Sequence, residues 1–126
     1  GHAGLFSTAS DVLNIVREYS DAVGGKGRIL CADLAHLCIT RSNQFSGSTR
    51  SLGWDTPSAP SSSGQYFSDR SFGHLGFTGT SIWVDPSIDL IVVLLTNRVH
   101  PRRDNDRIRV FRPQLHDLIY EWCAKL

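Results

Sequence analysis

The sequence predicts an α+β fold in which an antiparallel sheet is flanked by helices. Three observations predict it. Amphipathic helical patterns lie near both ends of the chain, an apolar hairpin pattern lies between them, and only a short turn separates the two strands of that hairpin, so they must run antiparallel. With 126 residues, 40% of them hydrophobic, the chain has the size of one domain or of part of a larger one.

The first helix is expected over residues 8 to 23, where apolar residues recur at helical spacing. They are Val12, Val16, Tyr19 and Val23. Thr8 and Asp11 predict a capping box, in which the hydroxyl accepts from the first-turn amides and the carboxylate reaches back to the cap N–H. Residues 31 to 40 predict a second, shorter helix. Its apolar side would be formed by Leu34, Leu37 and Cys38.

The middle of the chain predicts a loop region followed by β-structure. Residues 41 to 71 are rich in Ser, Gly, Pro and Asn and predict a long loop, interrupted by a short strand around residues 52 to 55. A loop of this length in a domain is usually functional or mobile. Residues 80 to 84 and 90 to 95 predict the two hairpin strands, with a turn at residues 85 to 87. The second strand is continuously apolar, which is typical of a strand buried on both faces.

The C-terminal part predicts a polar loop and a last helix. Six arginines lie within residues 98 to 112, interleaved with Asp104 and Asp106. This pattern predicts a solvated loop with local ion pairs, and phosphate binding is the alternative. Residues 114 to 125 predict the helix, with Pro113 at its start. Its apolar side would be formed by Leu115, Leu118, Ile119 and Trp122. Because the central-looking strands need neighbours, the pattern also predicts that strands of the sheet are missing from this chain.

Composition weighs against several classes of partner and site. The formal net charge of +1 provides no overall field for nucleic acid or for an anionic membrane, and no apolar run approaches the ~18 residues of a membrane span. The N-terminal residues 1 to 4 are not expected to be a signal peptide, because they have no basic start and begin no long apolar stretch. We expect no disulfide framework, no metal and no cofactor, and small buried thiols at each cysteine. The cysteines are Cys31, Cys38 and Cys123.

The most informative segment is residues 71 to 81, which place His74 between glycines at a strand edge. Glycine weakens a strand, so Gly73, Gly76 and Gly79 need a reason, and close approach of a ligand to the backbone is one. Without side chains at Gly76 and Gly79, a substrate would lie along the strand with backbone N–H groups directed at a developing oxyanion. The alternative is a glycine-rich turn between two strands, with His74 as an ordinary polar residue.

Residues 73 to 86 resemble the third active-site motif of the serine β-lactamase, penicillin-binding protein (DD-peptidase) and class C-like esterase superfamily, in which Lys or His is followed by Thr or Ser and then Gly. Residues 1 to 9, 52 to 55 and 92 to 101 resemble segments that flank this motif, in the same order. The resemblance implies a partial β-lactamase/transpeptidase-like fold. Residues 1 to 126 would then be the C-terminal part of a β-lactamase-like serine hydrolase domain.

The resemblance implies a role for each residue of the motif. His74 would take the cationic or hydrogen-bonding place and help to orient the proton relay and the substrate carboxylate. Phe77 would give a backbone N–H to the oxyanion hole, and Leu75, Gly76 and Thr78 would line the substrate. Leu75 stands where Thr or Ser is usual, so recognition of a carboxylate should be weakened and typical β-lactams should be poor substrates.

The nucleophile of the family is missing from this sequence. It lies in a Ser-x-x-Lys motif, but Val23 and Trp122 stand three residues before Lys26 and Lys125, the two lysines of the chain. The family's second motif, Tyr-x-Asn or Ser-x-Asn, and a Gly-x-Ser-x-Gly nucleophile elbow are also absent. Both missing family motifs precede the third in chain order, so the resemblance implies that the partner of this chain is the missing N-terminal part of the same fold.

The resemblance implies a serine hydrolase that acts on ester, amide or β-lactam acyl groups, of a small molecule or peptide, through an acyl-enzyme. This chain would supply one wall of the active site and would be inactive alone. The alternative is a non-catalytic peptide- or partner-binding module derived from that fold. A nucleic-acid-binding protein is the third interpretation, and a steep salt dependence of binding would be its mark.

Overall fold

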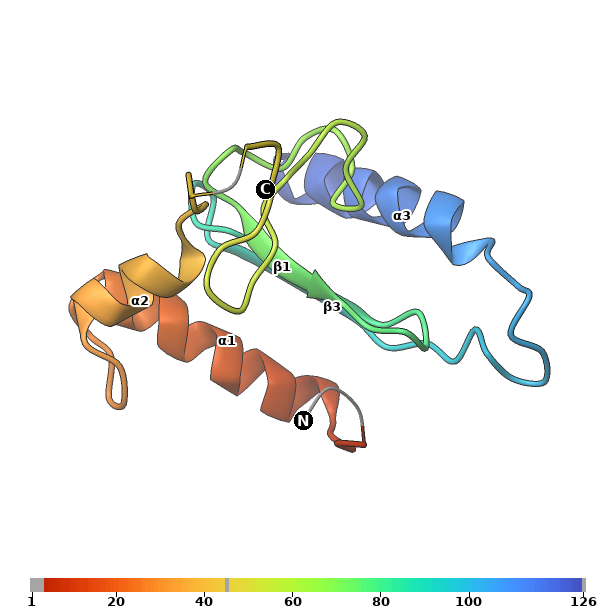
Figure 1. Ribbon diagram of the computed structural model, residues 1–126, viewed down its shortest axis with the longest axis horizontal. Coiled ribbons are helices and arrows are strands. Elements are labelled where there is room, and N and C mark those ends of the chain that lie inside the picture. The colour runs from red at the N-terminus through yellow and green to blue at the C-terminus, as the bar shows by residue number, and fades with distance from the viewer. Residues whose placement is uncertain (1–3, 45, 126) are drawn as a thin grey trace.

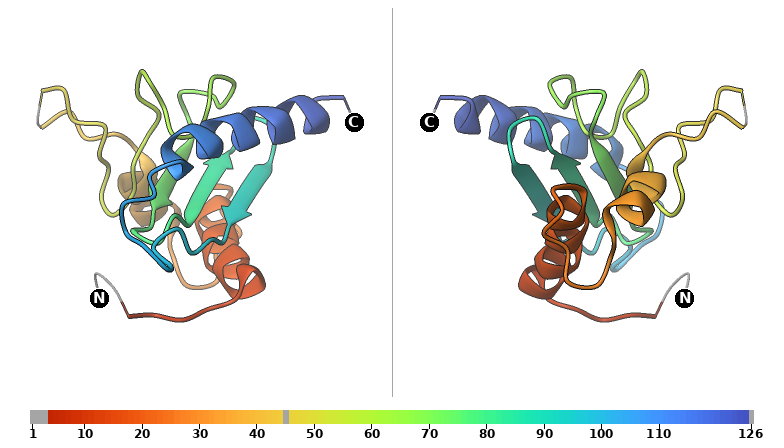
Figure 2. Two further views of the ribbon diagram at one scale, coloured as in Figure 1. Left: turned by 90° about the vertical axis from the view of Figure 1, so that its right-hand side faces the viewer. Right: turned by 90° about the vertical axis from the view of Figure 1, so that its left-hand side faces the viewer.

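The computed structural model describes residues 4–44 and 46–125. Its elements follow one another in the order α1 (Ala9–Val23), α2 (Ala32–Ile39), β1 (Phe72–Leu75), β2 (Ser81–Asp85), β3 (Leu90–Leu94) and α3 (Ile108–Cys123). They form three layers, with α1 and α2 on one face of the sheet and α3 on the other (Figures 1 and 2). The predicted α+β fold with an antiparallel sheet flanked by helices is therefore confirmed.

The strand β2 lies at the centre of the sheet and pairs antiparallel with both β1 and β3. Next to β1, Asp55 forms a single bridge with Gly73, in which each backbone N–H donates to the other residue's carbonyl oxygen, at 2.7 and 2.9 Å. The short strand predicted around residues 52 to 55 is therefore wrong. Gly53 has a φ of 93°, and Ser51 N donates to the carbonyl oxygen of Trp54 at 3.0 Å, so this segment turns.

One hydrophobic core lies between α1 and the sheet. Val16 of α1 packs there with Phe72 of β1 and Val84 of β2, surrounded by partly buried Tyr19, Ile39, Trp54, Ile82 and Ile91. The predicted cap of α1 is confirmed, because Asp11 N donates to the Thr8 hydroxyl oxygen at 3.2 Å. The Asp11 carboxylate accepts from that same hydroxyl at 2.9 Å, in place of the cap N–H that a capping box uses.

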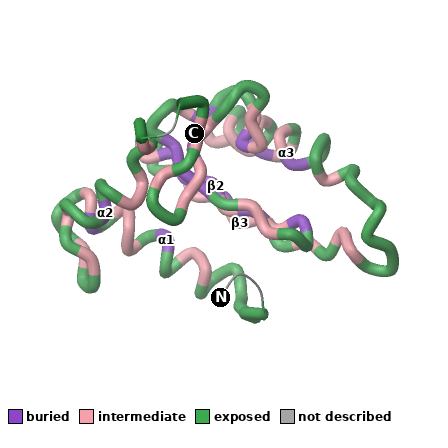
Figure 3. Tube along the Cα trace, in the orientation of Figure 1, coloured by how far each residue is buried: buried purple, intermediate pink, exposed green. Residues whose placement is uncertain are grey.

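A second core lies between the sheet and α3. Phe67, Trp83 of β2 and Val92 of β3 are buried there, against partly buried Leu90, Ile119 and Tyr120. Figure 3 shows that buried segments concentrate along the sheet and on one side of α3. Each face of the sheet therefore has its own core, and β2 contributes a buried residue to both, Val84 to the first and Trp83 to the second.

The last helix differs from its prediction in length and in orientation. It begins at Ile108 rather than after Pro113, which lies inside it. Pro113 removes one backbone N–H donor from the helix. The side chain of the preceding residue, buried Arg112, donates to the Gly79 carbonyl oxygen at 2.8 Å and so holds the first turns of α3 against the sheet. The predicted apolar side is also wrong in part, since Leu118 and Trp122 are 66% and 67% exposed.

Three further expectations about burial are wrong. The strand β3 lies at the edge of the sheet, and only Val92 of this strand is buried. Its outer edge pairs with no strand among the described residues, so the expectation of further strands stays a prediction. In α2 the small residue Ala35 is buried, whereas Leu34 and Leu37 are exposed. Of the cysteines, Cys31 is exposed and the other two are half-buried.

The loop region predicted over residues 41 to 71 is confirmed, because neither a helix nor a strand lies between α2 and β1 within the part of the chain described. Its last part, residues 61 to 67, lies against α3. No helix among the described residues combines the length and the apolar character needed to cross a bilayer.

Candidate active-site strand

The candidate site is built on β1 and on the loop that joins it to β2. Gly76 N donates to the carbonyl oxygen of Thr80 at 2.8 Å, and Gly79 N donates to that of Gly76 at 3.0 Å, so residues 76 to 80 form a tight turn. Position 79 requires glycine, because its φ of 97° lies in the left-handed region and a Cβ there would meet the Thr96 hydroxyl. The turn therefore fixes the backbone immediately after His74.

The other two glycines of the motif have packing reasons of their own. A Cβ at Gly73 would meet the indole ring of Trp83, and one at Gly76 would meet the Thr80 side chain. Both contacts lie within the hairpin, which is what the interpretation as a glycine-rich turn requires. The approach of a substrate to these glycines stays a prediction.

The strand places His74 and Leu75 on opposite faces of the sheet. His74 pairs with Ile82 and lies two residues from Phe72, so it belongs to the face that α1 covers. Its side chain is exposed, whereas Leu75 is half-buried on the face that α3 covers. A substrate that contacts both residues must therefore reach around the end of β1.

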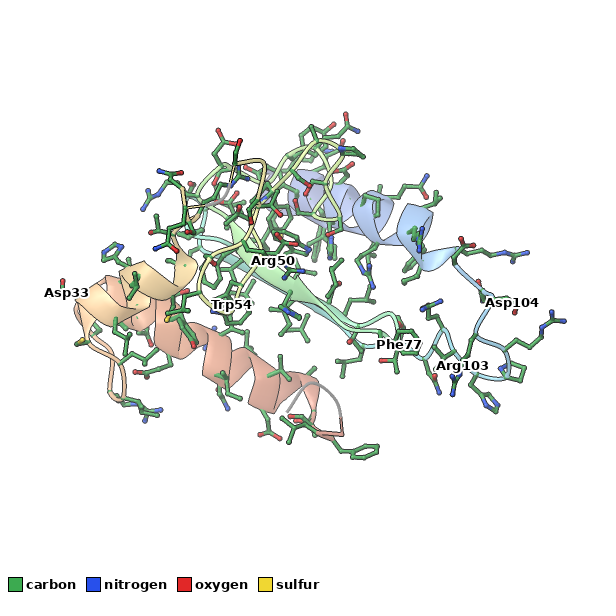
Figure 4. All side chains as sticks on the ribbon, viewed as in Figure 1. Asp33, Arg50, Trp54, Phe77, Arg103 and Asp104 are labelled. Carbon is green, nitrogen blue, oxygen red and sulfur yellow. The ribbon has the colours of Figure 1, made fainter. Side chains whose placement is uncertain are left out.

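Phe77 lies at the tip of the turn, with its side chain 67% exposed, and Figure 4 shows it at the far end of the sheet beside the loop that carries Arg103. None of the hydrogen bonds between described residues uses the Phe77 N–H, whereas its carbonyl oxygen accepts from Arg98 Nε at 2.9 Å. The next residue of the turn is fixed as well, because the Thr78 carbonyl oxygen accepts from Arg98 N at 2.9 Å and from the Thr96 hydroxyl at 3.1 Å. The turn thus leaves one donor available in a fixed backbone.

Arg98 is the residue that sequence reasoning missed. Besides Phe77, its guanidinium binds the carbonyl oxygens of Arg103 and Asn105, at 3.1 and 3.0 Å, and it lies 5.0 Å from the centre of the Phe77 ring. In the sequence it was one arginine among six, because backbone carbonyl partners have no residue signature. The local ion pair predicted for this segment is present between Arg102 and Asp104, at 2.5 Å.

Two residues of α3 hold the long loop in place. His116 is fully buried, and its Nδ1 lies 2.9 Å from the Ser62 carbonyl oxygen. Burial lowers the pKa of His116, against the smaller opposing effect of that hydrogen bond. The Asp117 carboxylate accepts from Gln65 N at 2.6 Å. Both contacts join the loop to α3 on the face of the sheet opposite His74.

Cavities beside β1 show what could bind at this part of the sheet. A cavity of about 520 Å³ lies between α1, α2 and the sheet, and Phe72 and Val84 form part of its wall. No residue of the predicted site lines it. A smaller pocket of about 250 Å³ lies at the end of β1, beside the turn. Its walls are Leu75, Gly76, Phe77, Arg98, Ile108, Arg109 and Arg112. Of the predicted site residues, Leu75, Gly76 and Phe77 therefore line the smaller pocket, whereas His74 and Thr78 line neither cavity.

Comparison with known proteins identifies the family to which the sequence is similar. A family model described as Beta-lactamase matches residues 1–114, of which residues 1–3 and residue 45 lie outside the described residues. An N-acetylmuramyl-L-alanine amidase of Bacillus subtilis (strain 168) is 32% identical over 103 residues, which are 79% of this chain and 23% of the relative. A putative D-alanyl-D-alanine carboxypeptidase of Escherichia coli (strain K12) is 30% identical over 104 residues, which are 79% of this chain and 24% of the relative.

A solved structure shares the fold. The crystal structure of a beta-lactamase from Mycobacterium bovis superposes with a TM-score of 0.74 at 23% identity, over 93% of this chain and 44% of that one. The chain therefore spans about a quarter of the length of the curated relatives described above, and less than half of this structural neighbour.

Proposed function

The chain belongs to the beta-lactamase family, and from this premise we propose that it forms one wall of the active site of a serine hydrolase. The observation that carries the proposal is the Phe77 N–H, which is free of partners among the described residues and stands in a turn clamped by Arg98. A preorganised donor of this kind stabilises the oxyanion that develops when a carbonyl carbon is attacked. His74 lies three residues earlier on the same hairpin and is exposed.

The reaction that fits these groups is acyl transfer. A serine hydroxyl attacks an ester, amide or β-lactam carbonyl, its proton passes to a base, and the leaving group departs with a proton to give an acyl-enzyme that water hydrolyses. The names of the two relatives, an amidase and a carboxypeptidase, support an amide as one such group. Because this sequence has no Ser-x-x-Lys, the serine and its lysine would come from the N-terminal part of the same fold.

Each residue of the motif has a part in this proposal. Phe77 contributes its N–H to the oxyanion hole, and His74 orients the proton relay from the α1 side of the sheet. Gly76 and Thr78 keep the backbone of the turn beside the substrate. Leu75 offers no hydroxyl, so β-lactams that depend on one at this position are poor substrates.

The test compares the chain alone with the chain joined to its upstream coding region. We expect the joined protein, but not the 126-residue chain, to be labelled by a fluorophosphonate, which reacts with activated serine. In the joined protein His74→Ala should lower the rate of p-nitrophenyl acetate hydrolysis, by at most the roughly 10²–10⁴-fold that a proton-transfer residue itself contributes, because His74 orients the relay. Hydrolysis by the chain alone that survives His74→Ala would contradict the proposal.

A second candidate is a non-catalytic module that binds a peptide or a partner. The outer edge of β3, which pairs with no strand among the described residues, favours it. An open edge offers backbone N–H and C=O groups to an added strand. Sedimentation of the purified chain separates the two candidates. A clean monomer that binds peptides supports the module, whereas self-association that ends when the N-terminal part is added supports the hydrolase.

The nucleic-acid interpretation has less support than either. Arg98 and Arg112 bind backbone carbonyl oxygens, and Arg102 is paired with Asp104, so half of the arginines predicted to contact phosphates are already engaged. Binding of a DNA duplex that weakens steeply between 50 and 200 mM salt, roughly 10³-fold or more, would restore it.

A further inference from the structure

The cavity of about 520 Å³ lies away from the candidate site, where the C-terminal ends of α1 and α2 meet the sheet. Its apolar floor is formed by Val23, Ile39, Phe72 and Val84. Phe72 begins β1, whereas the turn that carries Phe77 follows the other end of this strand. Ligand sites usually have roughly 300–1,000 Å³ and an apolar lining with a few polar groups. This cavity therefore has the size and the lining of a second ligand site.

Charged side chains of both signs line this cavity without pairing with one another. They are His36, Arg41, Asp69, Arg70, Asp85 and Asp89. The ion pairs within residues 4–44 and 46–125 join Arg50 to Asp55 and Arg102 to Asp104, so none of the cavity charges forms an ion pair there. Hydrogen bonds from the neighbouring loops already occupy the Asp85 carboxylate. The other charges remain available to a ligand, and contacts with them would be charge-assisted.

The two signs lie toward opposite sides of the cavity. Arg41 Nε donates to the Thr56 hydroxyl at 2.7 Å, and the preceding residue, Asp55, is bridged to the outer edge of β1. Asp89 stands in the turn between β2 and β3, immediately before β3. Three strand spacings of about 4.8 Å separate these two rows, so Thr56 and the start of β3 lie roughly 14 Å apart across the sheet. Arg41 and Asp89 therefore reach the cavity from opposite sides.

Each side has a second contribution of the same sign. Arg70 stands two residues before β1, and its side chain takes part in none of the hydrogen bonds between described residues. The adjacent Asp69 offsets one of the two arginine charges and leaves that side positive. On the other side, Gly24 caps α1, whose last turn carries no basic residue. The C-terminal end of a helix carries a partial negative charge, which adds to that of Asp89.

We propose that this cavity binds a linear zwitterion with a short apolar body, which is the chemistry of an ω-amino acid. Its ammonium group lies at Asp89 and the end of α1, and its carboxylate lies at Arg41 and Arg70. The apolar floor contacts the methylene groups between the two charges. This site goes beyond the proposed function and does not rest on it, because no residue of the candidate site lines the cavity.

The test is a titration of the ¹⁵N-labelled chain with 6-aminohexanoate, followed by NMR. We expect saturable shifts of the backbone amides of Gly24, Thr40 and Asp89, which line the cavity, and no shift of the Phe77 amide. Norleucine is an isomer of this probe with both charges on one carbon, and hexanoate lacks the ammonium group. Each should bind roughly tenfold more weakly, because each loses a charge-assisted contact at one side of the cavity.

Variants of the two sides make the test specific. Arg70→Gln and Asp89→Asn should each weaken binding of 6-aminohexanoate by roughly three- to tenfold. Asn tolerates the left-handed φ of 52° at position 89, so this substitution retains the backbone. Asp89→Asn should also bind hexanoate and 6-aminohexanoate alike. Arg103→Gln and Asp106→Asn, exposed in the loop before α3, should leave binding unchanged.

Several results would overturn the inference. They are an absence of shifts with 6-aminohexanoate, an equal affinity for norleucine, and an Asp89→Asn variant that still prefers 6-aminohexanoate to hexanoate. Because no step reads catalysis, failure here is distinguishable from failure of the proposed function, which the labelling of the joined protein decides.

Discussion

Arg98 Nε donates to the carbonyl oxygen of Phe77 at 2.9 Å, so the segment after β3 fixes the turn that follows β1. The two residues are joined a second time by the contact of the guanidinium with the Phe77 ring, at 5.0 Å. An oxyanion donor is useful only where its direction is set before the reaction. This clamp, rather than the glycines alone, gives the Phe77 N–H its direction.

Arg98→Ala should therefore loosen the turn and destabilise the chain. The variant loses hydrogen bonds to the carbonyl oxygens of Phe77, Arg103 and Asn105, and we expect the free energy of unfolding to fall by about 1–3 kcal/mol. The ¹⁵N order parameter of the Phe77 amide should fall as well. Arg102→Ala removes one exposed ion pair and serves as the control, with a change within about 1 kcal/mol. An unchanged order parameter in Arg98→Ala would show that the glycines suffice.

Gly79→Ala should cost more than Gly53→Ala, although the two glycines have nearly the same backbone. Their φ values are 97° and 93°, so both substitutions impose the strain of a left-handed conformation, about 1–2 kcal/mol. Only at residue 79 would the new methyl group meet a neighbour, the Thr96 hydroxyl, which is itself bound to the Thr78 carbonyl oxygen. Urea denaturation measures both variants, and equal losses would contradict the packing at Gly79.

The buried imidazole of His116 should make stability fall in mild acid. Burial lowers its pKa below the ordinary value of 6.5, so the unfolded chain binds this proton more readily than the folded chain. The stability that His116 contributes is therefore present above pH 6.5 and is lost as pH falls below it. Urea denaturation at pH 7.5 and 5.5 should show the loss, which His116→Gln should abolish and His100→Gln, at an exposed position, should retain. A pH dependence that survives in His116→Gln must come from another group.

Asp85 should also make stability depend on pH, at a lower pH than His116, because hydrogen bonds stabilise its ionised carboxylate. It is fully buried and accepts from Ser68 N and Ser68 Oγ, each at 2.7 Å, and from Ser87 N at 2.9 Å. Burial raises its pKa, but these bonds outweigh burial and hold the pKa below the ordinary 3.8, so its contribution is present above that pH and lost below it. Asp85→Asn should lower the free energy of unfolding by about 1.5–3 kcal/mol, whereas Asp89→Asn, an exposed position, should change it little. Comparable losses in both variants would contradict the role of burial.

Local patterns predicted the elements whose evidence is local. The cap at Thr8, the helical spacing in α1 and the short turn of the hairpin each depend on neighbouring residues, and each is confirmed. The predicted start of α3 was wrong because the evidence for it is not local. Pro113 and the basic composition before it indicate a loop, but the bond from Arg112 to the Gly79 carbonyl oxygen, 33 residues away, keeps that segment helical against the sheet.

The candidate site was predictable as a segment but not as an arrangement. Glycine spacing around His74 located the hairpin, and strand alternation could have placed His74 and Leu75 on opposite faces. The contacts of Arg98 with the turn could not be predicted from the sequence, because their acceptors are backbone carbonyl oxygens, which every residue has. The buried side of α3 was missed because a charged residue and a histidine, Arg112 and His116, occupy it, while apolar residues such as Trp122 remain exposed.

Trp83 and Val84 are neighbours on β2, yet each belongs to a different core, one against α3 and the other against α1. Among the strands of the described residues, β1 and β3 each contribute a buried residue to one core only. The two helical layers are thus energetically coupled through one strand, and fraying of β2 releases both at once. Subglobal opening of a single layer is therefore disfavoured, and the described chain should melt in one cooperative transition.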